Sequence, residues 1–255
     1  DYNFVTNNFD QLITAAEVFS GQPGTFKHPD IVNVNGYKFI AAIQTLPLVQ
    51  NLITKYYVAN IEYSSAAPVV FTTSGLMEEL RTPSVTTALE GHLIVAVNRL
   101  DHLNKKSYII LTGYSFLSSD YVRSIRANLT QETALTSNTN YKFTGFPSVA
   151  FTSTQFKTVE VAWQQINYTG TNYCTINAIS KRYTYDYYTF SFTSLNGNTQ
   201  FYYLSSDITK NSFYPSMAAL GAGLTTCLNY YSFGIIDKTT NVNGKVAYKK
   251  VYVMV

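Results

Sequence analysis

Strand-like runs that end in Asn-Gly pairs are the feature that most restricts the fold of this chain. Asn35-Gly36 separates "IVNV" from "YKFIA", and Asn243-Gly244 precedes the closing run "KVAYKKVYVMV". Asn-Gly favours the tight type I′ turn that joins two antiparallel strands. The tetrapeptide "NVNG" occurs at 33–36 and 241–244. We interpret it as one kind of turn used twice and not as an internal repeat.

Further runs carry the same signal. The stretches 90–100 and 106–116 flank a polar loop at 101–106 and predict another antiparallel pair. In 156–168, Val159, Val161 and Trp163 alternate with other residues, the pattern of a half-buried strand. Residues 52–64 add one more long β-rich run.

Three short helices are expected between the strands, at 7–21, 118–129 and 212–231. In the last of these, Met217, Leu220 and Leu224 recur at helical spacing, and Pro215 suits a first turn. Strands and helices do not alternate regularly, so a doubly wound parallel sheet is excluded. The sequence therefore predicts a mainly β fold. We expect one domain over residues 1–255, an antiparallel β-sandwich of the jelly-roll type.

Charged residues make up only 13% of the chain, about half the usual share of ~25% in soluble domains. The net charge is +3 without any basic run, so nothing in the charge favours a nucleic-acid partner. The surface is expected to be covered by Asn, Thr, Ser, Gln and Tyr. Such a surface is typical of secreted proteins, of sugar-binding proteins and of subunits that bury their surface against copies of themselves. The chain begins at Asp1 and no window is apolar enough to span a membrane, so we expect a processed protein in a virion or outside the cell.

No catalytic or cofactor motif is complete. "GYSFL" at 113–117 lacks the second glycine of a nucleophile elbow, and no phosphate-binding glycine motif is present. His102 follows Asp101, which leaves two interpretations, an acid–base pair or an exposed turn residue. Cys174 and Cys227 lie 53 positions apart and could be a disulfide or two buried thiols. We expect no catalytic residue, no cofactor and no metal.

Carboxylates are the remaining candidates for chemistry. Glycosidases use two carboxyl groups that the fold brings together, so they need no local motif. Glu160 and Asp186 would be that pair in this chain, since both lie on strand-like runs and Asp186 is surrounded by tyrosines.

The aromatic stretch 181–207 is predicted to form a hairpin around Asn196-Gly197. In that register Phe192 faces Phe201 and Phe190 faces Tyr203, giving an apolar face that belongs in the core. The aromatic face changes sides at Tyr187-Tyr188. The sequence therefore predicts a contact with a partner or ligand in the first half, at these residues: Tyr183, Tyr185, Asp186 and Tyr187.

Three functions fit these properties. The favoured one is a non-enzymatic structural subunit that assembles with copies of itself or related subunits, such as a viral capsid protein or a surface filament protein. The alternative is a secreted carbohydrate-binding module that recognises a cell-surface glycan. A glycoside hydrolase is the third.

Overall fold

The structure, a computed structural model, consists of antiparallel β-sheets. It describes residues 2–3, 8–9, 21–34, 37–58, 61–62, 69–88, 92–104, 106–116, 125–126, 133–138, 142–153, 157–168, 174–189, 191–195, 202–203, 210–222, 226–237 and 245–254. Those residues include no helix, and hence none that could cross a membrane. The prediction of a mainly β, antiparallel chain is confirmed.

Four sheets follow one another along the chain, after a small pair formed by β1 (Tyr2–Asn3) and β2 (Asn8–Phe9). Sheet 1 contains β3 (Thr25–Val34), β4 (Tyr37–Thr45), β5 (Gln50–Val58), β6 (Ile61–Glu62) and β7 (Val69–Thr73). Sheet 2 contains β8 (Glu78–Thr87), β9 (His92–Asp101), β10 (Lys106–Phe116), β11 (Ile125–Arg126) and β12 (Thr133–Asn138). Sheet 3 contains β13 (Lys142–Ser153), β14 (Thr158–Tyr168), β15 (Cys174–Asp186), β16 (Ser191–Ser194) and β17 (Tyr202–Tyr203). Sheet 4 contains β18 (Lys210–Ala222), β19 (Thr226–Asp237) and β20 (Lys245–Met254).

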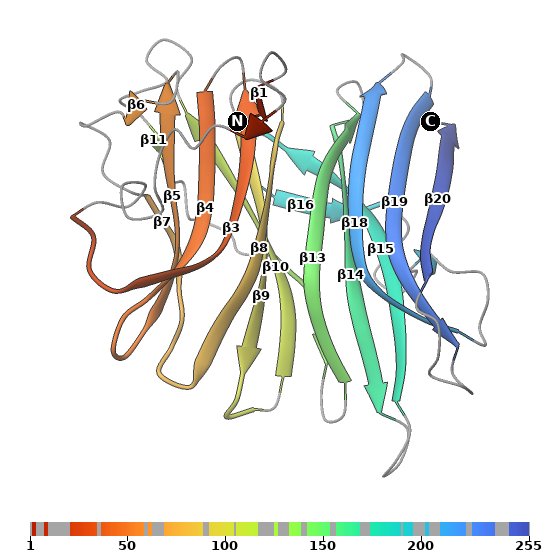
Figure 1. Ribbon diagram of the computed structural model, residues 1–255, viewed down its shortest axis with the longest axis horizontal. Coiled ribbons are helices and arrows are strands. Elements are labelled where there is room, and N and C mark those ends of the chain that lie inside the picture. The colour runs from red at the N-terminus through yellow and green to blue at the C-terminus, as the bar shows by residue number, and fades with distance from the viewer. Residues whose placement is uncertain are drawn as a thin grey trace.

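Each sheet is an up-and-down meander, and the sheets lie side by side in chain order (Figure 1). The first strands make the contacts between sheets, since β3 meets β8, β8 meets β13 and β13 meets β18. Successive meanders packed in this way are typical of β-propeller blades. A jelly roll would need Greek-key crossovers between two sheets, and none occurs among the described strands. The jelly-roll prediction is therefore not confirmed.

The helix predictions are not confirmed either. The segment 212–231 forms parts of β18 and β19, which pair with each other from Lys210↔Asp237 onward. Ile125–Arg126 is a strand paired with β10. Asn8–Phe9 is also a strand, and the rest of the first expected helix lies outside the described residues.

Sheet 2 is buried on both faces, which explains the unbroken apolar run of β9. Leu93, Val95 and Val97 lie in a core shared with sheet 1, whereas Ile94 and Ala96 lie in a core shared with sheet 3. Strand side chains alternate between faces, so one strand supplies both cores. The prediction of a half-buried strand at 156–168 needs a similar correction, because residues 158–164 are all buried.

The first strands of all four sheets share a short repeat of the form X-Pro-[Ser/Asp]. Its copies are His28-Pro29-Asp30, Thr82-Pro83-Ser84, Phe146-Pro147-Ser148 and Tyr214-Pro215-Ser216. At every copy the pairing with the second strand shifts register, which marks a β-bulge. Proline cannot donate to a sheet ladder and is confined to edge strands and bulges, and these first strands provide both. The chain thus has an internal repeat that the sequence analysis missed.

The third residue of the repeat links neighbouring sheets. The Asp30 carboxylate on β3 accepts a hydrogen bond of 2.7 Å from the Val85 amide on β8. The Ser84 hydroxyl accepts one of 3.2 Å from the Val149 amide on β13. In both cases the acceptor directly follows the proline of one sheet, and the donor lies two residues after the proline of the next. These sheet-linking bonds hold the repeat at the same height in sheets 1, 2 and 3.

We predict that Ser84→Ala lowers the free energy of unfolding by about 1 kcal/mol, because it leaves the Val149 amide without its acceptor. Ser216→Ala is the matched control, since Ser216 holds the same place in the repeat of sheet 4 but is exposed. The control should change stability by less than about 0.5 kcal/mol. Urea denaturation of both variants measures the difference, and equal losses would contradict a linking role for Ser84.

Candidate functional site

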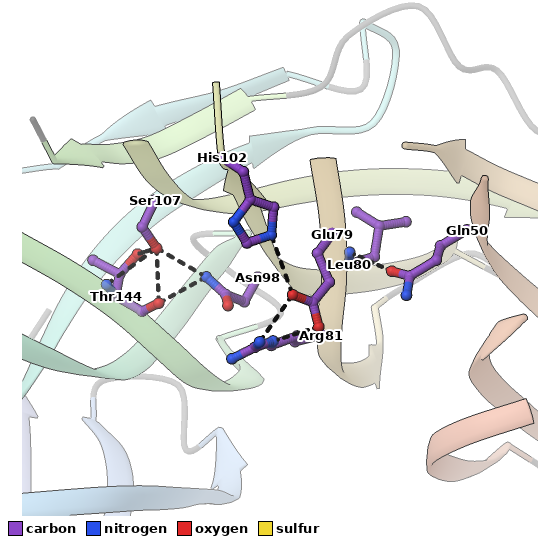
Figure 2. A network of polar contacts seen from close by, with 8 residues as sticks. All are labelled: Gln50, Glu79, Leu80, Arg81, Asn98, His102, Ser107 and Thr144. Carbon is purple, nitrogen blue, oxygen red and sulfur yellow. Dashed lines mark hydrogen bonds and ion pairs between the residues drawn. The ribbon is translucent and has the colours of Figure 1, made fainter. Parts of the chain in front are cut away.

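An ionic cluster lies where β8 begins and β9 ends. Arg81 donates two hydrogen bonds of 2.8 Å to Glu79, one to each carboxylate oxygen. His102 places Nε2 3.3 Å from Oε2 of the same carboxylate. The side chains of Arg81, Glu79 and His102 are 44%, 30% and 53% exposed, so a solute can reach all three. Figure 2 shows the two partners converging on one carboxylate.

The strand register brings these residues together. Glu79 pairs with Leu100 on β9, so its side chain lies beside the turn at 101–104. The His102 amide donates a 2.9 Å hydrogen bond to the Met77 carbonyl, which closes that turn onto β8. In the sequence, the adjacent Asp101 is the candidate partner of His102. The structure pairs it with Glu79 instead, 23 positions away.

The neighbouring carboxylates hold turns. Asp101 accepts hydrogen bonds from the amide and the side chain of Asn104, at 2.9 and 2.7 Å. Glu78 accepts one of 2.6 Å from the Gly75 amide and lies 3.8 Å from Arg99. Glu79 differs from both, because its carboxylate is bound by two charged or ionisable side chains, Arg81 and His102.

The hydrogen-bond partners of Glu79 control its protonation. The hydrogen bond from Arg81 lowers the pKa of this carboxyl below its ordinary value, and His102 acts in the same direction. The hydrogen bonds from Asn104 likewise lower the pKa of Asp101. At neutral pH both groups are carboxylates, so neither is suited to donate a proton.

A buried polar network lies beside the cluster (Figure 2). The Asn98 side chain donates to the Thr144 carbonyl at 2.8 Å, and the Ser107 hydroxyl donates to the same carbonyl at 2.9 Å. These bonds tie sheet 2 to sheet 3. On the other side, the Gln50 side-chain oxygen accepts a 2.7 Å hydrogen bond from the Leu80 amide and ties sheet 2 to sheet 1. Glu79 and Arg81 flank Leu80, so the bond from Gln50 fixes the backbone between them.

The first residue of the repeat in sheets 1, 2 and 3 forms a second feature, which we call the bulge row: His28, Thr82 and Phe146. All three have positive φ, at 53°, 40° and 53°. Non-glycine residues rarely adopt this conformation, and bulges re-aim side chains, often beside functional sites. His28 is exposed and Phe146 is 37% exposed. Arg81 of the ionic cluster directly precedes Thr82, so the row and the cluster adjoin.

The predicted contact segment is divided by the structure. Tyr183, Tyr185 and Tyr187 are 3%, 1% and 6% exposed and belong to the core between sheets 2 and 3. Their rings are therefore not available to a partner. Asp186 alone is exposed, and a partner contact there stays a prediction.

Burial of Tyr185 depends on two residues from sheet 2. Its hydroxyl lies 3.0 Å from Nδ1 of His92, and a Cβ at Gly113 would overlap that hydroxyl. Burial raises the pKa of Tyr185, and Tyr187 and Asp186 add to the shift. The ring stacks on Phe192 with centroids 4.9 Å apart. Phe192 is buried, as expected.

The predicted hairpin around Asn196-Gly197 is wrong in its pairing. Ser191–Ser194 pairs with the end of β15, where Tyr185 faces Phe192. The turn is at 187–189, and Asp186 closes it by accepting a 2.8 Å hydrogen bond from the Tyr188 amide. Tyr202–Tyr203 pairs with the middle of the same strand. Phe190 and Phe201 lie outside the described residues.

Glu160 and Asp186 do not form a catalytic pair. Glu160 is 2% exposed and accepts hydrogen bonds of 2.9 Å from both Ser180 and Arg182. Asp186 is exposed and fastens its turn. One is a buried ion-pair member and the other a turn residue.

Other candidates give no site. No group of three or more metal-binding side chains occurs in the part of the chain that the structure describes. The side chains of Cys174 and Cys227 lie outside what the structure describes, so their pairing stays open. The signal that could have revealed the bulge row was the recurrence of X-Pro-[Ser/Asp]. Its four copies are spaced unevenly, 54, 64 and 68 residues apart at their prolines.

Comparison with known proteins gives a distant likeness of fold. No protein-family profile matches the sequence, and no curated protein matches it. An endo-arabinase from Bacteroides thetaiotaomicron matches with a TM-score of 0.48 and 10% identity, over 94% of this chain and 79% of its own. An alpha-L-arabinanase from Cellvibrio cellulosa gives 0.46 and 10%, over 92% and 76%. An alpha-L-arabinofuranosidase from Podospora anserina gives 0.38 and 10%, over 92% of both chains. Similarity at this level does not transfer an activity.

The prediction of a non-enzymatic capsid or filament subunit is corrected by these findings. The matching structures named here are glycoside-cleaving enzymes and not coat proteins. The sheets also lack the jelly-roll order that the coat-protein hypothesis assumed. The capsid and virion assignments, and the expectation that the chain is not an enzyme, are therefore withdrawn.

We predict that Arg81→Gln raises the pKa of the Glu79 carboxyl toward its ordinary value, because Arg81 is the main cause of the lowering. A lowered pKa contributes stability above the unfolded-state pKa, and this contribution is lost as the pH falls through the folded-state pKa. NMR titration of the Glu79 side-chain carbon measures the shift. An unchanged midpoint in the variant would contradict the assignment.

We also predict that Glu160→Gln lowers the free energy of unfolding by about 3 kcal/mol, because it leaves Arg182 without its charge partner. Asp186→Asn is the matched carboxyl-to-amide control and should change the free energy of unfolding by less than about 0.5 kcal/mol, because Asn can accept the same turn hydrogen bond. A stable Glu160→Gln variant that loses a detected activity would restore Glu160 as a catalytic candidate.

Proposed function

We propose that the protein is a glycoside hydrolase whose reacting groups are Glu79 and His102. The observation that carries this proposal is the accessible cluster in which Arg81 and His102 converge on one carboxylate. Glu79 and Arg81 lie on β8, and His102 lies in the turn that follows β9 and is hydrogen-bonded to Met77, which suits the fixed geometry that catalysis requires.

The roles follow from charge. Cleavage of a glycosidic bond passes through an oxocarbenium-like transition state, which a nearby carboxylate stabilises. Glu79 is kept ionised by Arg81 and so supplies that negative charge. The leaving sugar oxygen needs a proton as its bond to the anomeric carbon breaks. His102 donates that proton, water adds to the anomeric carbon, and the proton released from water returns to the imidazole.

An imidazole acid departs from the usual pair of carboxyl groups. Support for it comes from the carboxyl groups whose pKa is shifted in the described part of the chain. Glu79, Asp101 and Asp186 are all shifted downward, so none of them is a ready proton donor. Histidine is the side chain most often used as a general acid or base.

The test is release of reducing sugar from a panel of polysaccharides that covers neutral pentose, neutral hexose and uronate backbones. Glu79→Gln and His102→Gln should each lower the rate on the active substrate by at least about 100-fold, the range expected for loss of an acid–base group. Asp186→Asn, the exposed carboxylate that fastens a turn in sheet 3, is the control and should retain full activity. Full activity in folded Glu79→Gln protein would refute the proposal.

A further inference from the structure

The bulge row places three unlike side chains at one level across three sheets. The hydrogen bonds from Val85 to Asp30 and from Val149 to Ser84 align the repeats of neighbouring sheets. Because the three copies are aligned, His28, Thr82 and Phe146 form a line that crosses the three first strands, with one residue on each of β3, β8 and β13. Packed sheets are about 10 Å apart, so the row spans roughly 20 Å.

The repeat separates into a constant and a variable part. The proline and the Ser or Asp recur in every copy, and they form the bulge and the sheet-linking bonds. The first residue is His, Thr, Phe or Tyr, and the residue before it is Lys27, Arg81, Gly145 or Phe213. A position that served only the backbone would need no such variety, and at positive φ glycine would be the unstrained choice.

The two ends of the row differ in chemistry. At the sheet 1 end, Lys27 and His28 are both exposed, and neither side chain has a hydrogen bond or ion pair within the described residues. In the middle, Arg81 is already neutralised by Glu79. At the sheet 3 end, Phe146 presents a partly exposed ring. The row thus offers unneutralised donors at one end and an apolar ring at the other.

We propose that the two ends of the bulge row, at Lys27 and His28 and at Phe146, bind an acidic oligosaccharide across the buried Thr82 hydroxyl. The carboxylate of one sugar is bound by Lys27 and His28, a neutral ring face packs on Phe146, and the scissile bond lies by Glu79 in between. This inference rests on the proposed glycoside hydrolase function and names its substrate class. A single-stranded nucleic acid would also pair stacking with cations, but it requires a continuous basic groove, which a chain of net charge +3 with alternating donors and carboxylates does not supply.

The experiment uses isothermal titration calorimetry on the full chain with tetra-galacturonic acid and with its methyl ester, which has the same backbone without charge. The wild type should bind the acid at least tenfold more tightly than the ester. Lys27→Gln should remove most of that preference while leaving the affinity for the ester unchanged. Phe146→Gly should weaken both ligands at least fivefold, because the ring contact is independent of charge.

Lys157→Gly is the matched control. Lys157 has the same strained backbone, with φ at 51°, but lies beyond the far end of β13, so its variant should bind both ligands as the wild type does. Each glycine variant relieves the backbone strain but loses its side-chain contacts, so circular dichroism must show that both variants are folded before their binding is compared. Loss of binding without loss of folding then identifies a ligand site.

Three results would overturn the inference: equal affinity for acid and ester, equal losses in Lys157→Gly and Phe146→Gly, or tighter binding of a thymidine oligonucleotide than of the acid. Chromatography of the ligand after the titration shows whether it was cleaved. Cleavage tests the proposed hydrolase function, whereas the titration itself tests binding. Binding of the acid without cleavage refutes the hydrolase and supports the site. Cleavage of a neutral glycan with no binding of the acid does the reverse.

Discussion

The hydrogen bond from the amide of one first strand to the side-chain oxygen of the preceding first strand is the interaction on which the rest of the structure depends. A first strand is a sheet edge, and its proline removes one amide from any ladder. Apolar packing between sheets is non-directional. It fixes the distance between two sheets but not how far one sheet is shifted along the strands of the other. The Asp30–Val85 and Ser84–Val149 bonds add the missing direction, because each has one donor and one acceptor position. The polar network beside Glu79 and the level of the bulge row both require that alignment.

Burial of sheet 2 on both faces explains where the aromatic residues go. A sheet with two cores needs large side chains from both neighbours, and β15 supplies Tyr183 and Tyr185 to the side shared with sheet 3. A buried phenol needs a hydrogen-bond partner, which Tyr185 finds in His92 at the start of β9. The small Gly113 leaves room for that hydroxyl. The density of tyrosine in this stretch therefore reflects the thickness of the core, and the exposed chemistry lies at the other end of the sheets.

Local features could be predicted from the sequence, and long-range ones could not. The Asn-Gly hairpin is confirmed where Val34 faces Tyr37, because a turn and its two strands are encoded within a dozen residues. The helix prediction for 212–231 is wrong because apolar residues at spacings of three and four also fit two bulged strands. Pro215 likewise fits a bulge as well as the first turn of a helix. Glu79 and His102 are 23 positions apart and meet only through strand register. The repeat is hard to recognise in the sequence because only its proline is invariant and its copies are spaced unevenly.

Backbone strain also indicates that the side chains of the bulge row serve ligand binding as well as folding. A non-glycine residue in the left-handed region costs about 1–2 kcal/mol. This chain does use glycine in that conformation at Gly21 and at Gly24, where a Cβ would also overlap the Thr45 carbonyl oxygen. It accepts the strain at Lys157, whose ammonium lies 4.9 Å from the Tyr187 ring centre and so contributes an interaction of its own. His28, Thr82 and Phe146 carry the same strain at aligned positions, and the side chains retained there differ in each sheet. Recognition of an asymmetric ligand requires that difference, whereas the bulge itself does not.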